Sequence, residues 1–307
     1  MKKPIHETGL EKFNQIHTFT NIIFNFIFII LALVCVVPVF FVLMISLTSE
    51  KALASGYQMI PSEFSLEAYR FLIKQADMVL PALGISLFVT IVGTIIGVVL
   101  TTTLGYVMSR PNYRLKSFFT WMVFIPMVFN GGMVSSYYIN ANLLHLKDSV
   151  WALIIPLAVS SFNVIICRTF FRTTIPDSLI ESAKIDGATQ LLIYRKIILP
   201  ISLPVLATIG LFLCFGYWND WFQSMLYIDN QRMYSLQALL NMIMKNVEYL
   251  TKNAALLGVD AAQLAATLPK EGSRMAIAII IVFPVACAYP FFQKYFISGL
   301  TVGAVKG

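Results

Sequence analysis

Long apolar runs alternate with shorter polar segments along this chain. A helix needs roughly 20 mostly apolar residues to cross the hydrocarbon core of a bilayer. Six segments meet this requirement, at about 21–47, 81–108, 118–138, 150–171, 201–228 and 274–297. We therefore predict an all-α polytopic membrane protein with six transmembrane helices, preceded by a polar N-terminal segment at residues 1–20.

Composition supports a place in a membrane rather than in solution. Hydrophobic residues make up 58% of the 307 positions and charged residues only 12%, whereas soluble domains average about 25% charged residues. The net charge is +7, but the basic residues stand in short clusters between apolar runs. This is typical of topology determinants and not of a nucleic-acid-binding face.

The distribution of Lys and Arg predicts the orientation of the spans. Short cytoplasmic loops are enriched in basic residues. The 109–117 loop has three basic residues and no acid, whereas the 139–149 loop has Lys147 beside Asp148. Basic residues also mark the tail before the first span and the 172–200 loop: Lys2, Lys3, Lys12, Arg172, Lys184, Arg195 and Lys196. Six spans with both termini in the cytoplasm place these regions on one side and leave loops 48–80 and 229–273 outside.

The 172–200 loop carries the signals of an ordered helical hairpin. Pro176 stops the preceding span, and Asp177 or Ser178 can cap the free amides of a new helix. Residues 178–185 are then expected to form two helical turns.

Glycine and proline divide the rest of this loop. Gly187 supplies the left-handed conformation that ends a helix. A second helix is expected over 188–198, broken at Leu199-Pro200, with the next span starting at Ile201. From the residues alone, the loop is either an interfacial hairpin that anchors the bundle or a lever that transmits the motion of a partner.

The same loop resembles the signature of the permease subunits of ABC importers, with Ser182 standing where that family more often has Ala. The matching residues are Glu181-Ser182-Ala183, Asp186-Gly187-Ala188, Ile197 and Leu199-Pro200. Further stretches are similar to the carbohydrate-importing subgroup: Gly56-Tyr57, Pro61, Ser65 to Arg70, Tyr217 to Trp221, and Gly299 to Gly307. The whole chain resembles the second permease of maltose-type importers.

This resemblance implies a type I importer permease fold in the bacterial cell membrane. It also implies that the loop is a coupling helix, which docks on an ATP-binding subunit through Glu181, Ser182, Ala183, Asp186, Gly187 and Ala188. The implied partners are a second permease, two ATP-binding subunits and an extracytoplasmic binding protein. The implied cargo is a sugar, and we expect an oligosaccharide.

The chain itself is not expected to be an enzyme. It contains no Gly-x-x-x-x-Gly-Lys-Ser/Thr phosphate loop, so ATP and Mg²⁺ are expected to be used by partner subunits. The three histidines and four cysteines lack metal-site spacing, and we expect no metal or cofactor on this chain. Two alternatives stay open: a permease for a peptide or amino acid, and a membrane sensor or scaffold that docks a signalling protein.

Polar residues inside the predicted spans are candidates for the substrate path. Such residues tend to face a bundle interior or a cavity, and aromatic faces beside amide and carboxylate groups suit a sugar. The candidates are Asn130, Asn163, Trp218, Asn219 and Asp220, with Ser160 and Ser161 beside them. A structural role is an open alternative for each, because Trp gathers at membrane interfaces and Asn or Ser often bonds a neighbouring helix.

Overall fold

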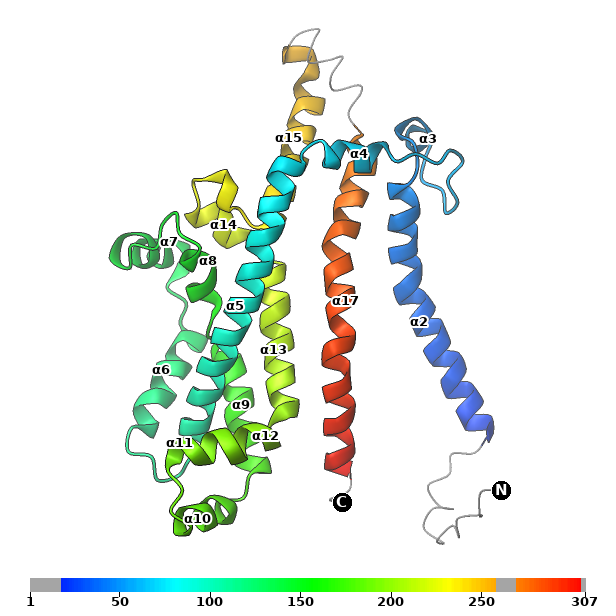
Figure 1. The fold of residues 1–307 in the computed structure, drawn as a ribbon. Coiled ribbons are helices and arrows are strands. Elements are labelled where there is room, and N and C mark those ends of the chain that lie inside the picture. The colour runs from blue at the N-terminus through cyan, green and yellow to red at the C-terminus, as the bar shows by residue number, and fades with distance from the viewer. Residues whose placement is uncertain (1–17, 258–268, 305–307) are drawn as a thin grey trace.

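The structure is a computed structural model that describes residues 18–257 and 269–304. Its described residues are mainly helical (Figure 1). Long helices lie side by side along one direction, while short helices gather at the two ends of the bundle. The expected segment 1–20 lies largely outside the described residues, as do the last three residues of the chain.

Three helices are long and apolar enough to cross a membrane within the described residues. They are α2 (Thr18–Ser46), α5 (Ala76–Ser109) and α17 (Lys270–Ala304), the last over Lys270–Pro290. Two bent pairs of helices raise this number to five if each pair is one span. The membrane-protein class agrees with the sequence analysis, and the count of six stays a prediction.

The other predicted spans are interrupted helices. Segment 118–138 divides into α6 (Lys116–Val128) and α7 (Gly132–Tyr137), which leads into a π-helix, η1 (Tyr138–Leu143). Gly132 has a φ of +81° at this break. Segment 150–171 divides into α8 (Trp151–Ile154) with the 3₁₀ turn η2 (Ile155–Leu157), followed after a 50° bend by α9 (Ser161–Thr174).

The fifth segment is also divided. Helix α13 (Leu203–Trp218) gives way to the short α14 (Phe222–Tyr227) and the 3₁₀ turn η4 (Gln231–Met233). The long helix α15 (Leu236–Leu257) follows and projects from the end of the bundle (Figure 1). The helical pattern expected over Ala261 to Leu268 lies outside the described residues.

The main core forms where α5 packs against α9 and α13. Gly105 lets the backbones of α5 and α9 approach closely. A Cβ at this position would lie only 2.6 Å from the Cβ of Cys167 in α9, which is too close for two carbon atoms. The Tyr217 hydroxyl of α13 donates a 2.8 Å hydrogen bond to the Ile154 carbonyl. These close contacts fix the relative positions of three helices.

Helix α2 stands at the edge of the bundle and packs mainly against α17 (Figure 1). Most of its side chains are exposed, as expected for a helix surrounded by lipid or by another membrane subunit. Its Thr18 end and the Ala304 end of α17 both lie at the end of the bundle that carries the 172–200 loop.

The 48–80 loop is ordered at the opposite end. It contains α3 (Glu50–Ala54) and α4 (Glu67–Ile73), and Thr48 pairs with Phe64 as an isolated antiparallel bridge. The Glu50 carboxylate accepts hydrogen bonds from the Glu271 and Gly272 amides, at 3.0 and 3.2 Å. It thereby satisfies amides left free in the first turn of α17.

Candidate functional site

The first helix of the 172–200 loop begins close to its predicted position. Pro176 is in an extended conformation and precedes α10 (Asp177–Ile185). The cap expected from Asp177 or Ser178 is absent, because no side-chain hydrogen bond caps this helix. The Asp177 carboxylate instead faces α5, where it pairs with Arg110.

Helix α10 ends as the sequence predicts. Gly187 has a φ of +80°, the left-handed conformation that L-residues with a Cβ adopt at a cost. The Ala188 amide donates to the Ala183 carbonyl and the Gly187 amide to the Lys184 carbonyl, at 2.9 and 3.0 Å. These two bonds form a Schellman motif. A Cβ at Gly187 would meet nothing within 4 Å, so the requirement for glycine is conformational and not steric.

The second helix of the loop is longer than predicted. Thr189 caps it by accepting from the Leu192 amide, and it continues through α11 (Gln190–Ile193), the π-helix η3 (Tyr194–Ile198) and α12 (Leu199–Ile201). The break expected at Leu199-Pro200 lies instead at Ser202, where the chain bends by 82° into α13. Pro200 stands in the first turn of α12, where a missing amide is tolerated.

One face of α10 is buried and the other is exposed. Ile180 and Ala183 are 4% and 8% exposed and join the main core. On the outer face Ile185 is 86% exposed, and Leu191 of α11 is also exposed. Ile185 and Leu191 thus expose apolar surface on either side of the turn at Gly187.

The signature residues divide between these two faces. Ala183 is buried and Ala188 is half-buried, so both pack the loop against the bundle. Glu181, Ser182, Asp186 and Gly187 are exposed. The loop therefore presents a polar, conformationally fixed turn next to the exposed Ile185.

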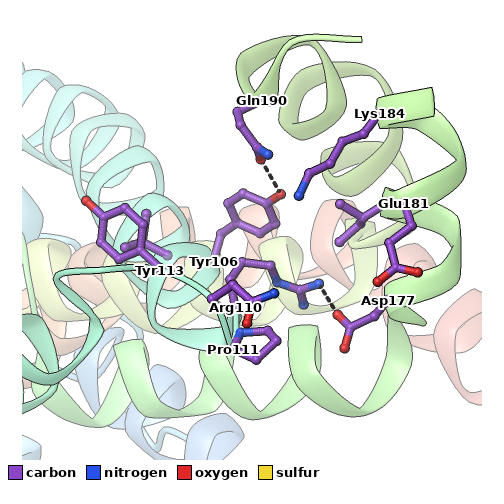
Figure 2. Close-up of a pocket in the computed structure, with 11 residues that line it drawn as sticks. Tyr106, Arg110, Pro111, Tyr113, Asp177, Glu181, Lys184 and Gln190 are labelled. Atoms are coloured by element: carbon purple, nitrogen blue, oxygen red, sulfur yellow. Dashed lines mark hydrogen bonds and ion pairs between the residues drawn. The ribbon is translucent and has the colours of Figure 1, made fainter. Parts of the chain in front are cut away.

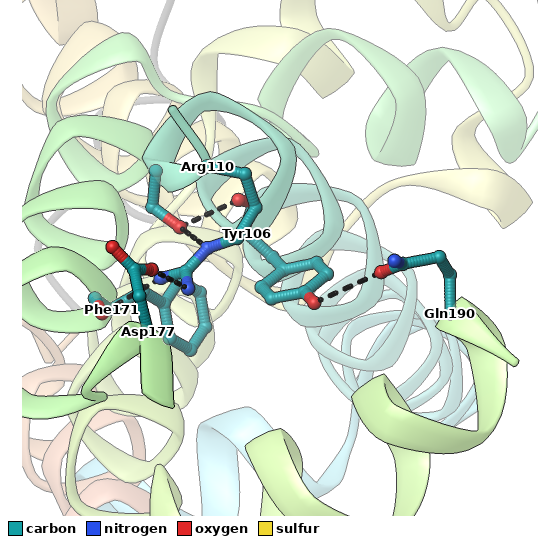
Figure 3. Close-up of polar contacts among 6 residues, drawn as sticks. Tyr106, Arg110, Phe171, Asp177 and Gln190 are labelled. Atoms are coloured by element: carbon teal, nitrogen blue, oxygen red, sulfur yellow. Dashed lines mark hydrogen bonds and ion pairs between the residues drawn. The ribbon is translucent and has the colours of Figure 1, made fainter. Parts of the chain in front are cut away.

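Arg110 connects the end of α5 with α9 and α10 (Figure 3). Its guanidinium donates to the Asp177 carboxylate at 3.0 Å and to the Phe171 carbonyl of α9 at 3.1 Å. Its Nε donates to the Ser109 hydroxyl at 3.0 Å, and its charge lies 5.3 Å from the centre of the Tyr106 ring. The side chain is only 13% exposed. We call Arg110 with Asp177 and the Phe171 carbonyl the arginine node.

A second set of contacts joins the other half of the loop to α5. The Tyr194 hydroxyl lies 2.8 Å from the Thr102 hydroxyl. The rings of Tyr106 and Tyr194 are 5.3 Å apart, and the Tyr106 hydroxyl donates to the Gln190 side chain at 3.5 Å (Figure 3). Both helices of the loop are thus tied to the same end of α5.

A cavity of about 320 Å³ lies between α10, α11 and the end of α5 (Figure 2). Arg110 and Asp177 lie on one side of it, and Glu181, Lys184 and Gln190 also line it. The loop therefore packs into the main core through its buried residues and also leaves an open space between its polar contacts and the end of α5.

The candidate substrate-path residues lie on separate elements. Asn130 is exposed between α6 and α7, where its side chain accepts from the Gly132 amide, and Asn163 is buried in α9. Trp218 is buried and donates its indole N–H to the Ile281 carbonyl of α17 at 3.0 Å.

Local hydrogen bonds involve the remaining candidates. Asn219 donates to the Phe215 carbonyl of its own helix, and the Asp220 carboxylate accepts from the Gln223 amide at the start of α14. Ser160 precedes α9 and its carbonyl accepts from the Val164 amide, whereas Ser161 is the first residue of α9. A role of any of these residues in a substrate path stays a prediction.

The residues that hold the loop in place were not predicted from the sequence. Arg110 is one of the three basic residues of the 109–117 loop, which indicated only the orientation of the spans, and Tyr106, Thr102 and Gln190 carry no local signal. One signal could have identified Arg110. It directly follows a long apolar run, and a basic residue there can donate to the free carbonyls at the end of a neighbouring helix.

Comparisons with known proteins identify relatives over nearly the full length of the chain. No protein-family model matches it. It is 36% identical over 290 residues to the polygalacturonan/rhamnogalacturonan transport system permease protein YtcP of Bacillus subtilis, covering 94% of this chain and 98% of that protein. It is 35% identical over 275 residues to Protein LplC of Bacillus subtilis, covering 89% of this chain and 90% of that protein.

A solved structure agrees with these relatives. One chain of a bacterial ABC transporter involved in the import of the acidic polysaccharide alginate matches with a TM-score of 0.72 and 26% identity. The match covers 95% of the chain described above and 99% of the solved one. The fold and the sequence therefore indicate the same group of proteins.

Proposed function

The chain belongs to the family of permease subunits of bacterial carbohydrate ABC importers, and on this premise we propose that α10 is its docking element for an ATP-binding subunit. The protein is a multi-pass membrane permease, and the family contributes the translocation path and not the ATPase. The observation that carries the proposal is the exposed Ile185 beside the fixed turn at Gly187, on a helix whose opposite face is buried.

The arginine node supplies a route for coupling. A force on α10 reaches α5 through the Asp177–Arg110 ion pair and α9 through the Phe171 carbonyl. Since α5 packs directly on α9 and α13, a displacement of α10 would move the helices that form the main core. Such rigid elements joined by a few polar contacts can have two discrete arrangements.

We further propose six spans with both termini in the cytoplasm, and an assembly with a second permease, two ATP-binding subunits and a binding protein. The common end of α2, α10 and α17 supports this orientation (Figure 1). The proposed cargo is an oligosaccharide, because the named relatives include a permease for polygalacturonan and rhamnogalacturonan. A peptide cargo or a scaffold role has no comparable support.

Reconstitution of the complete importer in liposomes tests this function. ATP-driven uptake of a labelled oligosaccharide, from a panel that includes galacturonan fragments and neutral glucans, is the expected result. ATP hydrolysis without accumulation of any sugar in the panel would contradict the proposed cargo. Failure of the purified permease pair to retain an ATPase subunit would contradict the docking role.

A further inference from the structure

A second, smaller cavity lies on the other side of the arginine node. Its volume is about 130 Å³, and it is lined by Ser109, Arg110, Pro111, Lys116, Arg172 and Asp177. Three of these side chains are basic and one is acidic, which gives the lining a net charge of +2. The cavity is thus small and strongly cationic.

The basic groups in this lining are incompletely neutralised. Asp177 already pairs with Arg110. Within the described part of the chain, the side chains of Lys116 and Arg172 form no ion pair. Three cations close together repel one another, and an anion between them would relieve this repulsion and accept charge-assisted hydrogen bonds.

The position of the cavity indicates where that anion comes from. Arg110 follows the last residue of α5, Lys116 is the first residue of α6, and Arg172 lies in the last turn of α9. The C-terminal ends of α5 and α9 and the N-terminal end of α6 therefore surround the cavity, on the side that we propose to be cytoplasmic. Basic pockets between the ends of transmembrane helices are suited to the phosphate of an anionic lipid.

An exposed apolar face runs along the side of α6 that points away from Lys116. Phe118, Trp121, Met122 and Ile125 recur at helical spacing on this face, and each is exposed. Aromatic residues near the end of a span are typical of the interfacial region of a bilayer. This exposed face indicates that α6, whose first turn borders the cavity, lies next to lipid.

We propose that this cavity binds the phosphate group of an anionic phospholipid. Lys116 and Arg172 supply the charge-assisted contacts, and Arg110 contributes the guanidinium N–H groups that the node leaves free. This site rests on the proposed cytoplasmic orientation of these helix ends, and the docking of α10 on an ATP-binding subunit is tested separately.

The test uses the complete importer in nanodiscs and measures retained lipid by native mass spectrometry. Nanodiscs of equal phosphatidylglycerol and phosphatidylcholine are compared for the native complex, the double variant Lys116→Gln/Arg172→Gln, and a control double variant Arg114→Gln/Lys196→Gln. The control removes the same charge from exposed residues of the same loops that do not line the cavity. Gel filtration with the partner subunits checks that each variant assembles.

We expect the cavity variant to lose its preference for phosphatidylglycerol by about tenfold or more, because it removes direct charge-assisted contacts to the phosphate. The control should lose less than about threefold, because its residues do not line the cavity. An unchanged preference in the cavity variant would overturn the proposal, as would equal losses in both variants. In a separate arm, inorganic phosphate is added at about 10 mM; retention of phosphate that Lys116→Gln/Arg172→Gln abolishes, with no preference for phosphatidylglycerol in the native complex, would assign the cavity to a soluble phosphate and overturn the lipid source. Uptake assays do not enter any arm, so failure here leaves the docking role untouched.

Discussion

Two charged side chains at opposite ends of the bundle fix loops to helix termini in complementary ways. Arg110 donates to a carbonyl in the last turns of α9, the negative end of that helix, whereas Glu50 accepts from the first amides of α17, the positive end. The surroundings of these two side chains differ. The arginine node borders two cavities and supports the helix that carries the exposed Ile185, whereas the Glu50 carboxylate contacts the first turn of α17 directly.

Gly272 lies in ordinary van der Waals contact with the loop at the Glu50 end. A Cβ at Gly272 would lie 3.4 Å from the Cβ of Ala68 and 3.5 Å from the Glu50 carboxylate. At the arginine node, the Asp177–Arg110 ion pair joins α10 to the end of α5 beside two cavities, while Ile180 and Ala183 pack α10 into the main core. We therefore expect the Glu50 end to hold its loop in place and the Arg110 end, with open space beside its polar contacts, to relay a displacement.

The largest effect is expected from Gly187→Trp. A residue with a Cβ in the left-handed region costs about 1–3 kcal/mol, so the Schellman motif would rearrange and displace the turn from its docking position. We expect oligosaccharide uptake in reconstituted liposomes to fall by about tenfold or more, since 1.4 kcal/mol corresponds to a factor of ten. Membrane insertion should be unchanged.

Gly187→Asn is the matched control, because asparagine tolerates the left-handed conformation better than other residues with a Cβ. It should retain most of the uptake. Normal uptake by Gly187→Trp would contradict the proposed coupling role of this loop.

The next largest effect is expected from Arg110→Gln. This change removes the ion pair and leaves the Phe171 carbonyl without its charged donor; hydrogen bonds to charged groups contribute about 1.5–3 kcal/mol each. We expect α10 to remain docked on the ATPase but to move α5 less, so that the number of sugars imported per ATP hydrolysed falls severalfold. Uptake and ATP hydrolysis measured on the same liposomes give this ratio.

Arg114→Gln, in the same loop, serves as the control and should leave the ratio unchanged. Equal losses of uptake and hydrolysis in Arg110→Gln would show that the node only stabilises the fold.

Glu50→Gln tests the other side of the comparison. The amide oxygen can still accept from the first amides of α17 but loses the negative charge, which is worth about 0.3–1 kcal/mol at a helix N-terminus. We expect the melting temperature of the complex to fall by a few degrees, while the ratio of uptake to hydrolysis stays constant. A changed ratio would mean that this end also takes part in coupling.

The smallest effect is expected from Tyr57→Phe. The Tyr57 hydroxyl donates to the Glu271 carboxylate at 3.0 Å on an exposed part of the Glu50 end, and this hydrogen bond raises the pKa of Tyr57 above its usual value. Exposed polar contacts contribute little, so we expect a change in unfolding free energy within about 0.5 kcal/mol. A loss as large as that of Glu50→Gln would place the hydroxyl among the main contacts of this end.

The sequence predicted the elements that depend on local signals. Pro176 and Gly187 determine where α10 begins and ends, because proline and glycine act through their own backbone geometry. The apolar runs likewise predicted α2, α5 and α17, because a bilayer imposes a minimum helix length.

Contacts between distant residues could not be predicted in this way. Arg110 reaches Asp177 across 67 positions of the chain, and it does so only because α5 packs closely on α9 at Gly105. The bend also lies at Ser202 and not at the expected Pro200, because the helix that starts at Gln190 continues through Pro200 to Ile201 before the chain turns into α13.

Photo-crosslinking at Ile185 tests the central claim most directly. A photoreactive phenylalanine analogue replaces Ile185 in the complete importer, and the same analogue at the exposed Ile60 of the opposite end is the control. We predict a covalent adduct between position 185 and the ATP-binding subunit whose yield changes when ATP is added, and no such adduct from position 60. If position 185 labels only lipid or the second permease, α10 is not the docking element.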